Sequence, residues 1–115
     1  MHNFRKIKAW EEAMDLAMMV YEQTKSFPES EKFGLVTQLR RCAVSIVSNI
    51  AEGAGRDSKP QFVHFLSIAS ASGNELLAQL ILSNRLNFIT DTEFKLLEDK
   101  TDKLQRMLTK FKNQL

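Results

Sequence analysis

Apolar residues recur at steps of three and four along most of the chain, which is the pattern of one buried face on an α-helix. In the first segment this spacing predicts a helix over residues 4–26. Its apolar face holds Ile7, Trp10, Met14, Ala17, Tyr21 and Thr24. Phe27-Pro28 ends that helix, because the residue before a proline disfavours helical backbone angles. A second helix is expected over residues 30–52, with Gly53 as the glycine that commonly follows a helix C-terminus.

Two further helices follow. The third is expected over residues 59–86, with Ser58 as its N-cap and Pro60 in its first turn. The fourth, over residues 91–112, opens with a capping box in which Thr90 and Glu93 satisfy each other's free backbone N–H groups. Its apolar positions keep a strict 3-4 spacing: Phe94, Leu97, Thr101, Leu104, Leu108, Phe111 and Leu115.

No segment alternates apolar and polar residues with period two, so no sheet is expected. The connections are only a few residues long, and short connections make consecutive helices antiparallel neighbours. A chain of 115 residues is close to the usual size of one domain. The pattern therefore predicts an all-α protein with a single domain over residues 1–115, folded as an antiparallel up-down-up-down four-helix bundle.

The second helix is more apolar than a surface helix needs to be. Its apolar positions cover an arc of roughly 200°, about twice the minimum stripe of a surface helix. Because large exposed apolar patches usually mark interfaces, we expect a homo-oligomer through the second and third helices. A helix fully enclosed in a monomeric core is the alternative. The candidate interface residues are Val36, Val44, Val47, Ala51, Ile68 and Leu82.

Composition narrows the class of protein. The chain is 43% hydrophobic and 26% charged, as in an ordinary soluble domain. Its densest apolar run, LLAQLIL, is far shorter than the ~20 residues of a membrane span, and MHNFRKIKAW has no apolar signal-peptide core. Cys42 is the only cysteine and is expected to be a small buried apolar residue. We expect a cytoplasmic protein that does not bind membranes.

The stretch RRCAVSIVSNIAEGAGR, residues 40–56, raises the question of a phosphate-binding loop. Such loops follow a strand and lead into a helix N-terminus, where free N–H groups meet the anion. Gly53-Ala54-Gly55-Arg56 instead leaves the C-terminus of a helix and matches neither common glycine-rich phosphate motif. The two glycines are expected only to let the chain reverse direction.

Side chains for catalysis or metal binding are scarce. Neither histidine, His2 or His64, has a glutamate three residues before it, as a di-iron bundle would require. One cysteine and two distant histidines make no zinc spacing. His64 is expected on the solvated surface. We therefore predict no catalytic residue, no metal, no cofactor and no enzymatic activity.

Polar residues of the second and third helices form a candidate cleft. Antiparallel helices joined at residues 53–58 pair symmetrically about that connection, which brings Arg40 or Arg41 within about a turn of Glu75. We interpret this as a structural ion pair, with Asn49 and Glu52 bonding to backbone near the connection. The expected structural polar cluster is Arg40, Arg41, Asn49, Glu52 and Glu75.

Charge sorts by the end of the predicted bundle. The start of the first helix, the connection between the second and third, and the end of the fourth gather eight basic residues against Glu52 and Asp57. Helix-dipole complementarity accounts for part of this pattern but not for the basic start of the first helix. We expect this end to attract RNA or DNA, with solvated charge as the alternative. The basic residues are Arg5, Lys6, Lys8, Arg56, Lys59, Arg106, Lys110 and Lys112.

The joint spacing of several motifs resembles one known family, the four-helix-bundle proteins encoded by intervening sequences in bacterial 23S ribosomal RNA genes. The likeness covers essentially the whole chain. Cys42 and Ala71-Ser72-Gly73 depart from the family pattern. The motifs that carry the likeness include Phe27-Pro28, Phe33-Gly34-Leu35, Arg40-Arg41, Asn49-Ile50-Ala51-Glu52-Gly53, Phe65-Leu66 and Glu75-Leu76.

The resemblance implies a bundle that assembles as a homo-oligomeric ring, with a pentamer expected, and it implies no enzymatic activity. Members are often labelled ribosomal proteins from their gene location. Relatives serve as accessory proteins of diversity-generating retroelements, which contact nucleic acid and a reverse transcriptase. We therefore expect a non-enzymatic oligomer that associates with RNA or DNA through its basic end. The alternative is an assembly module that binds a protein partner such as a reverse transcriptase.

Overall fold

The computed structural model describes residues 1–115 and contains four α-helices with two short 3-10 turns. The predicted all-α class, with four helices and no strand, is confirmed. The elements in chain order are η1 (Phe4–Lys6), α1 (Lys8–Thr24), η2 (Glu29–Glu31), α2 (Leu35–Ala54), α3 (Lys59–Arg85) and α4 (Asp91–Gln114).

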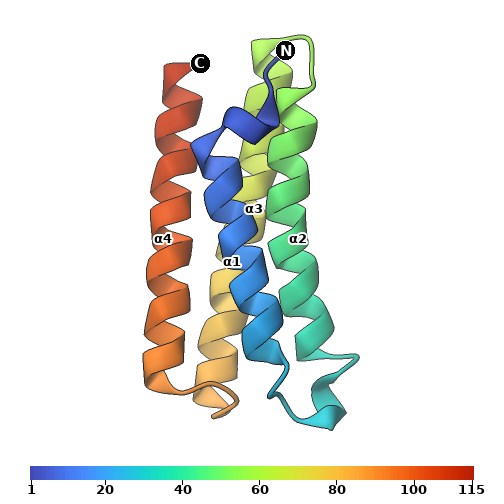
Figure 1. Cartoon of the computed structure of the whole chain (residues 1–115), viewed down its shortest axis with the longest axis vertical. Coiled ribbons are helices and arrows are strands. Elements are labelled where there is room, and N and C mark those ends of the chain that lie inside the picture. The colour runs from blue at the N-terminus through green and yellow to red at the C-terminus, as the bar shows by residue number, and fades with distance from the viewer.

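The helices lie side by side along the long axis of a molecule that measures 43 × 24 × 19 Å, and consecutive helices run in opposite directions (Figure 1). Each helix packs against its neighbours in chain order and α4 closes against α1, whereas the diagonal pairs α1–α3 and α2–α4 do not approach each other. Both termini and the α2–α3 connection therefore lie at one end of the molecule (Figure 1).

All four helices contribute aliphatic side chains to one core. The middle of the α4 seam, from Leu97 to Leu108, is buried as the 3-4 spacing predicts, whereas its end positions are half-buried. Within the seam the Thr101 hydroxyl donates to the Leu97 carbonyl at 2.7 Å. That hydrogen bond satisfies the one polar side chain of the seam. The large aliphatic side chains with the least exposure are Leu16, Val20, Leu39, Ile46, Ile50, Leu66, Leu76, Leu80, Leu97, Leu104 and Leu108.

The first helix is shorter than predicted. Ile7 has an extended backbone (φ −86°, ψ 117°) that separates η1 from α1, and its side chain is buried in the core. At the other end α1 stops at Thr24, and Phe27 is buried beyond it. The prediction of one helix over residues 4–26 was wrong at both ends, because the extended backbone at Ile7 interrupts the helix and α1 stops before residue 26.

The second helix begins at Leu35 and not at residue 30. Residues 29–31 form the turn η2, and the backbone at Gly34 is not helical (φ −110°, ψ −109°). The Glu31 carboxylate accepts a hydrogen bond from the Leu35 N–H at 3.3 Å. The turn therefore supplies an acceptor for a first-turn donor that the helix itself leaves unsatisfied.

The predicted role of Gly53 was wrong as well, since Gly53 lies inside α2 and is buried. A Cβ atom there would stand 2.9 Å from Phe62 Cδ1 and 2.9 Å from Phe65 Cβ. The absence of a side chain thus allows α2 and α3 to approach closely. The helix ends at Ala54, and Gly55 follows it in an ordinary right-handed conformation (φ −84°, ψ −3°).

The predicted start signals of α3 and α4 are confirmed. Ser58 Oγ accepts from the Gln61 N–H at 3.3 Å. In the capping box, Thr90 Oγ1 accepts from the Glu93 N–H at 3.1 Å and Glu93 Oε1 accepts from the Thr90 N–H at 2.8 Å. By length and composition alone α3 is apolar enough to cross a membrane, with a mean hydropathy of 1.3 over 18 residues, and it packs in the bundle between α2 and α4.

Candidate functional site

The N-terminal segment lies over the end of the bundle that holds both termini and the α2–α3 connection (Figure 1). The His2 N–H donates to the Ala54 carbonyl at 2.8 Å, which ties the segment to the last turn of α2. Asn3 caps η1 through its side chain, and the Ile7 side chain is buried in the core. The start of the chain is therefore a fixed part of this surface.

Three rings meet beside this segment. The His2 imidazole lies edge-on to Phe62, with centroids 5.0 Å apart, and to Phe111 at 6.4 Å. Phe62 and Phe111 are 5.5 Å apart. Phe62 is buried, Phe111 is half-buried and His2 is exposed. Periodicity did not indicate this cluster, because His2 precedes every helix and belongs to no repeating pattern.

A groove of about 740 Å³ runs between the N-terminal segment and α4, and we call it the N-terminal groove. Three of the predicted basic residues line it, namely Lys6, Lys8 and Lys110. His2 and Phe111 line the same groove, which combines three cations with aromatic surface.

Two smaller grooves share residues with the N-terminal groove and extend it on both sides. One of about 500 Å³ runs along α4 and joins Lys110 to Arg106. The other, about 200 Å³, joins His2 to Arg56 and Lys59 at the start of α3. Six of the eight predicted basic residues thus border one continuous grooved surface.

Most of these cations have no carboxylate partner. Arg56 is the exception, since it pairs with Glu52 at 2.6 Å, and its guanidinium lies over the Phe65 ring at 4.7 Å. The other seven form no ion pair. Two of these seven, Arg5 and Lys112, border none of the three grooves. The positive charge at this end is therefore largely uncompensated.

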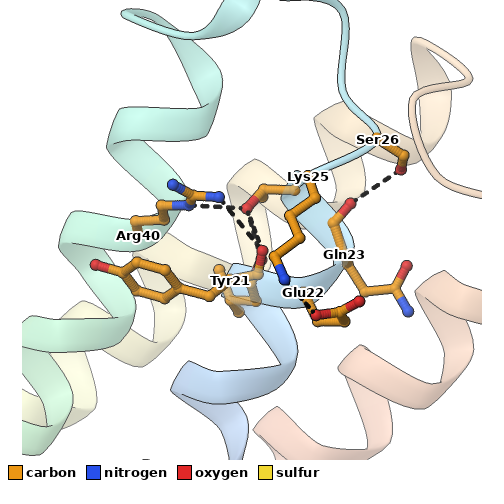
Figure 2. Close-up of polar contacts among 8 residues, drawn as sticks. Tyr21, Glu22, Gln23, Lys25, Ser26 and Arg40 are labelled. Atoms are coloured by element: carbon orange, nitrogen blue, oxygen red, sulfur yellow. Dashed lines mark hydrogen bonds and ion pairs between the residues drawn. The ribbon is translucent and has the colours of Figure 1, made fainter.

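The predicted polar cluster does not form, and Arg40 shows why. Figure 2 shows the Arg40 side chain directed at the end of α1. Its Nε donates to Thr24 Oγ1 at 3.0 Å, its Nη2 donates to the Tyr21 carbonyl at 3.3 Å, and its guanidinium stacks over the Tyr21 ring at 4.6 Å. Arg40 thus donates hydrogen bonds at the α1 C-terminus, where backbone carbonyls lack donors from the helix itself.

Glu75 faces Cys42 and not an arginine. Cys42 Sγ donates to Glu75 Oε2 at 3.1 Å, and burial together with this carboxylate raises the pKa of the Cys42 thiol to about 12. Glu75 forms no ion pair with Arg40 or Arg41, so the expected pairing was wrong. The rotation of α2 against α3 sets Cys42 opposite Glu75 and leaves Arg41 exposed.

The other members of the predicted cluster make local contacts. Asn49 Nδ2 donates to the Ser45 carbonyl at 2.8 Å and to the Ser45 hydroxyl at 3.1 Å. Glu52 bonds to the Arg56 side chain and not to backbone. Ser45 Oγ also lies 2.8 Å from Ser72 Oγ of α3. This part of the α2–α3 contact is a seam of small polar residues.

The predicted oligomer interface divides into separate surfaces. Val36 is only 8% exposed, so its assignment to an interface was wrong; α2 packs against both α1 and α3, which encloses most of its apolar arc. Val44 and Val47 line a groove of about 380 Å³ between α1 and α2, whereas Ala51 is half-buried outside it. Ile68 and Leu82 are exposed on α3.

Side chains that could ligate a metal are dispersed. No three His, Cys, Asp or Glu residues come together as metal ligands do. His64 is exposed, as expected, with its ring 5.5 Å from that of Phe65. Cys42 is buried, as predicted, and a thiol with a pKa of about 12 is protonated at neutral pH and is a poor nucleophile.

Comparison with known proteins identifies a structure with the same fold and a matching family. A crystal structure of a protein of unknown function from the S23 ribosomal protein family of Bacteroides thetaiotaomicron shares the fold, with a TM-score of 0.82 at 22% sequence identity over 90% of this chain and 97% of that chain. No curated protein matches the chain. The family model described as 23S rRNA-intervening sequence protein matches residues 5–110. The chain therefore belongs to the 23S rRNA-intervening sequence protein family.

Proposed function

We propose that this protein is a non-enzymatic nucleic-acid-associated protein that holds the phosphate backbone of RNA or DNA through its basic end. The observation that carries the proposal is the set of cations without carboxylate partners that border one continuous grooved surface. Such a surface attracts polyanions and displaces their counterions. Contacts of this kind fix the position of a strand without reading its sequence.

Anisotropy titrations with fluorescent RNA and DNA over a range of salt concentrations test this proposal. The double variant Arg106→Gln/Lys110→Gln is expected to lower the slope of log K against log salt by about 1.4–1.8, because each phosphate contact contributes about 0.7–0.9. The matched control is Lys32→Gln/Arg85→Gln, which removes the same charge from the opposite end. Absence of binding at low salt, or an equal loss in the control, contradicts the proposal.

We also propose that the subunits assemble head to tail into a ring. The protomer carries two different exposed apolar surfaces, the α1–α2 groove and an α3 surface that includes Ile68 and Leu82. A two-fold dimer repeats one self-complementary patch, whereas two complementary patches on different sides of a subunit give a head-to-tail contact, which forms a ring when the rotation between subunits closes. A ring would set the basic ends of neighbouring subunits beside one another.

Variants on the two surfaces separate these kinds of assembly. In analytical ultracentrifugation, Val44→Glu and Leu82→Glu are each expected to give monomers, because a buried unpaired carboxylate opposes association. An equimolar mixture of the two variants retains one intact groove and one intact α3 surface, so it is expected to form heterodimers. A wild-type monomer at micromolar concentration, or a mixture that remains monomeric, contradicts head-to-tail assembly.

A further inference from the structure

The N-terminal groove combines an anion site with an aromatic surface, which are the two parts of a nucleotide-binding site. We propose that it takes one unpaired nucleotide, with the phosphate at the N-terminus of α1 and the base against His2 and Phe111. The protein would then bind single-stranded RNA or DNA in preference to duplexes. This inference rests on the proposed function and specifies the form of nucleic acid that the basic end accepts.

The phosphate half of the site is the start of α1. Ile7 occupies the N-cap position and offers no hydrogen-bonding side chain. The backbone N–H groups of Lys8 and Ala9 donate to no acceptor within the protein. Both residues line the N-terminal groove. Free N–H groups at the positive end of a 17-residue helix form a ready site for an anion.

The lysines around this helix start support an anionic ligand. Cations near a helix N-terminus interact unfavourably with the helix dipole, so Lys6 and Lys8 stand where α1 disfavours them. No carboxylate pairs with Lys6, Lys8 or Lys110. A bound phosphate would contact the free N–H groups and the lysines together. A ligand thus accounts for a placement of charge that helix stability alone opposes.

The base half of the site is formed by His2 and Phe111. The His2 imidazole is exposed and no hydrogen bond holds its ring, whereas Phe111 is fixed against the core. Their planes are inclined by 65° in an edge-on contact, so a base that stacks on one ring would turn its edge toward the other. Aromatic faces stack with any base, which gives binding without sequence preference.

The size of the groove and the structure of a duplex determine the preference. The volume of about 740 Å³ lies within the range of roughly 300–1,000 Å³ that is typical of small-ligand sites. The Gln114 amide at the groove offers a donor and an acceptor to a base edge. A duplex keeps its bases stacked inside and presents phosphates outward, so only an unpaired base can reach the two rings.

Anisotropy titrations with fluorescent oligouridylate, oligodeoxythymidylate and a DNA duplex, each of about 12 nucleotides in length, test the inference. We expect wild-type protein to bind the single strands more tightly than the duplex. His2→Ala and Phe111→Leu should each weaken single-strand binding by about tenfold and leave duplex binding unchanged. Phe94→Leu is the matched control, because Phe94 is also a half-buried α4 phenylalanine packed on the core. The RNA and DNA strands report whether the sugar contributes.

The outcomes separate the two proposals. Equal affinity for single strands and duplex, unchanged in both ring variants, overturns the single-strand inference and leaves phosphate binding by the basic end intact. Absence of binding to every probe overturns both. Equal weakening on single strands and duplex also overturns the inference, because the rings would then act only through the fold. Should Phe111→Leu fail to fold, the exposed His2 side chain allows His2→Ala to decide the result alone.

Discussion

At the end of the bundle that holds the α1–α2 and α3–α4 connections, most carboxylates have partners, whereas at the opposite end most cations have none. Glu22 pairs with Lys25 at 2.9 Å, and Lys95 lies 3.5 Å from Glu98 and 3.2 Å from Asp99. At the basic end Arg56 is the only cation in an ion pair. The two ends therefore differ in how far their predominant charges form ion pairs within the protein.

Further carboxylates at the end that holds the α1–α2 and α3–α4 connections, which we call the acidic end, lie at helix starts. Glu31 accepts from the first turn of α2, Glu93 completes the capping box of α4, and Asp91 accepts from Asn84 Nδ2 at 2.9 Å. Acidic groups near a helix N-terminus stabilise the helix. Lys6 and Lys8 at the start of α1 do the reverse. The carboxylates of the acidic end therefore stabilise helix starts, whereas the lysines at the start of α1 do not.

The largest effect is expected where α2 meets α3 at the basic end. Gly53→Ala should destabilise the protein by about 1–3 kcal/mol, because the new Cβ would press on Phe62 and Phe65. Gly55→Ala is the control two residues away: its Cβ would lie 3.6 Å from the Glu52 carbonyl oxygen, an ordinary contact, and its effect should be within about 0.5 kcal/mol. Urea unfolding measures both, and equal effects would contradict the close-packing role of Gly53.

At the acidic end, loss of the α4 cap should cost less. Thr90→Ala removes the acceptor for the Glu93 N–H and is expected to lower the free energy of unfolding by about 1 kcal/mol. Thr92→Ala, in the same turn but without a side-chain hydrogen bond, should leave stability nearly unchanged. A matching loss in thermal melts of both variants would show that the cap is not what stabilises this end.

Charge removal at the basic end should separate stability from binding. Lys8→Gln relieves an unfavourable cation at a helix N-terminus, so it is expected to stabilise the protein by about 0.3–1 kcal/mol while weakening nucleic-acid binding. Lys112→Gln removes a favourable cation from the last turn of α4 and should destabilise by a similar amount. Urea unfolding and anisotropy on the two variants check these signs. If Lys8→Gln is less stable than the wild type, the proposal that Lys8 is placed for a ligand is contradicted.

The smallest effect is expected from the paired lysine of the acidic end. Hydrogen bonding to Asp99, with the charges of Asp99 and Glu98, raises the pKa of Lys95 above its usual value of 10.5. A raised lysine pKa stabilises the fold below the unfolded-state pKa, and the contribution disappears as pH rises through the folded-state pKa. The free energy of unfolding of Lys95→Gln should therefore fall less steeply at alkaline pH than that of the wild type. Lys32 forms no ion pair, so Lys32→Gln is the control, and its free energy of unfolding should fall with pH as that of the wild type does.

Local patterns predicted much of the fold but less of the candidate site. The 3-4 spacing of α4, the Ser58 cap and the Thr90 capping box depend on residues within a turn or two of one another, so sequence alone was enough to find them. The basic end was predicted from helix direction and the positions of charged residues. The contribution of His2 was missed, because it depends on how the N-terminal segment lies beside Phe62 and Phe111.

The sequence by itself determined the number and order of the helices and the N-caps of α3 and α4, because periodicity and capping depend on residues within one element. Helix order and the positions of charged residues also determined how charge divides between the two ends. Only the tertiary structure decided that Gly53 is a contact between helices, that Arg40 bonds to α1 and that Glu75 meets Cys42. These contacts depend on the rotation and register of one helix against another. Rotation and register follow from packing of the whole core, which no local stretch of sequence specifies.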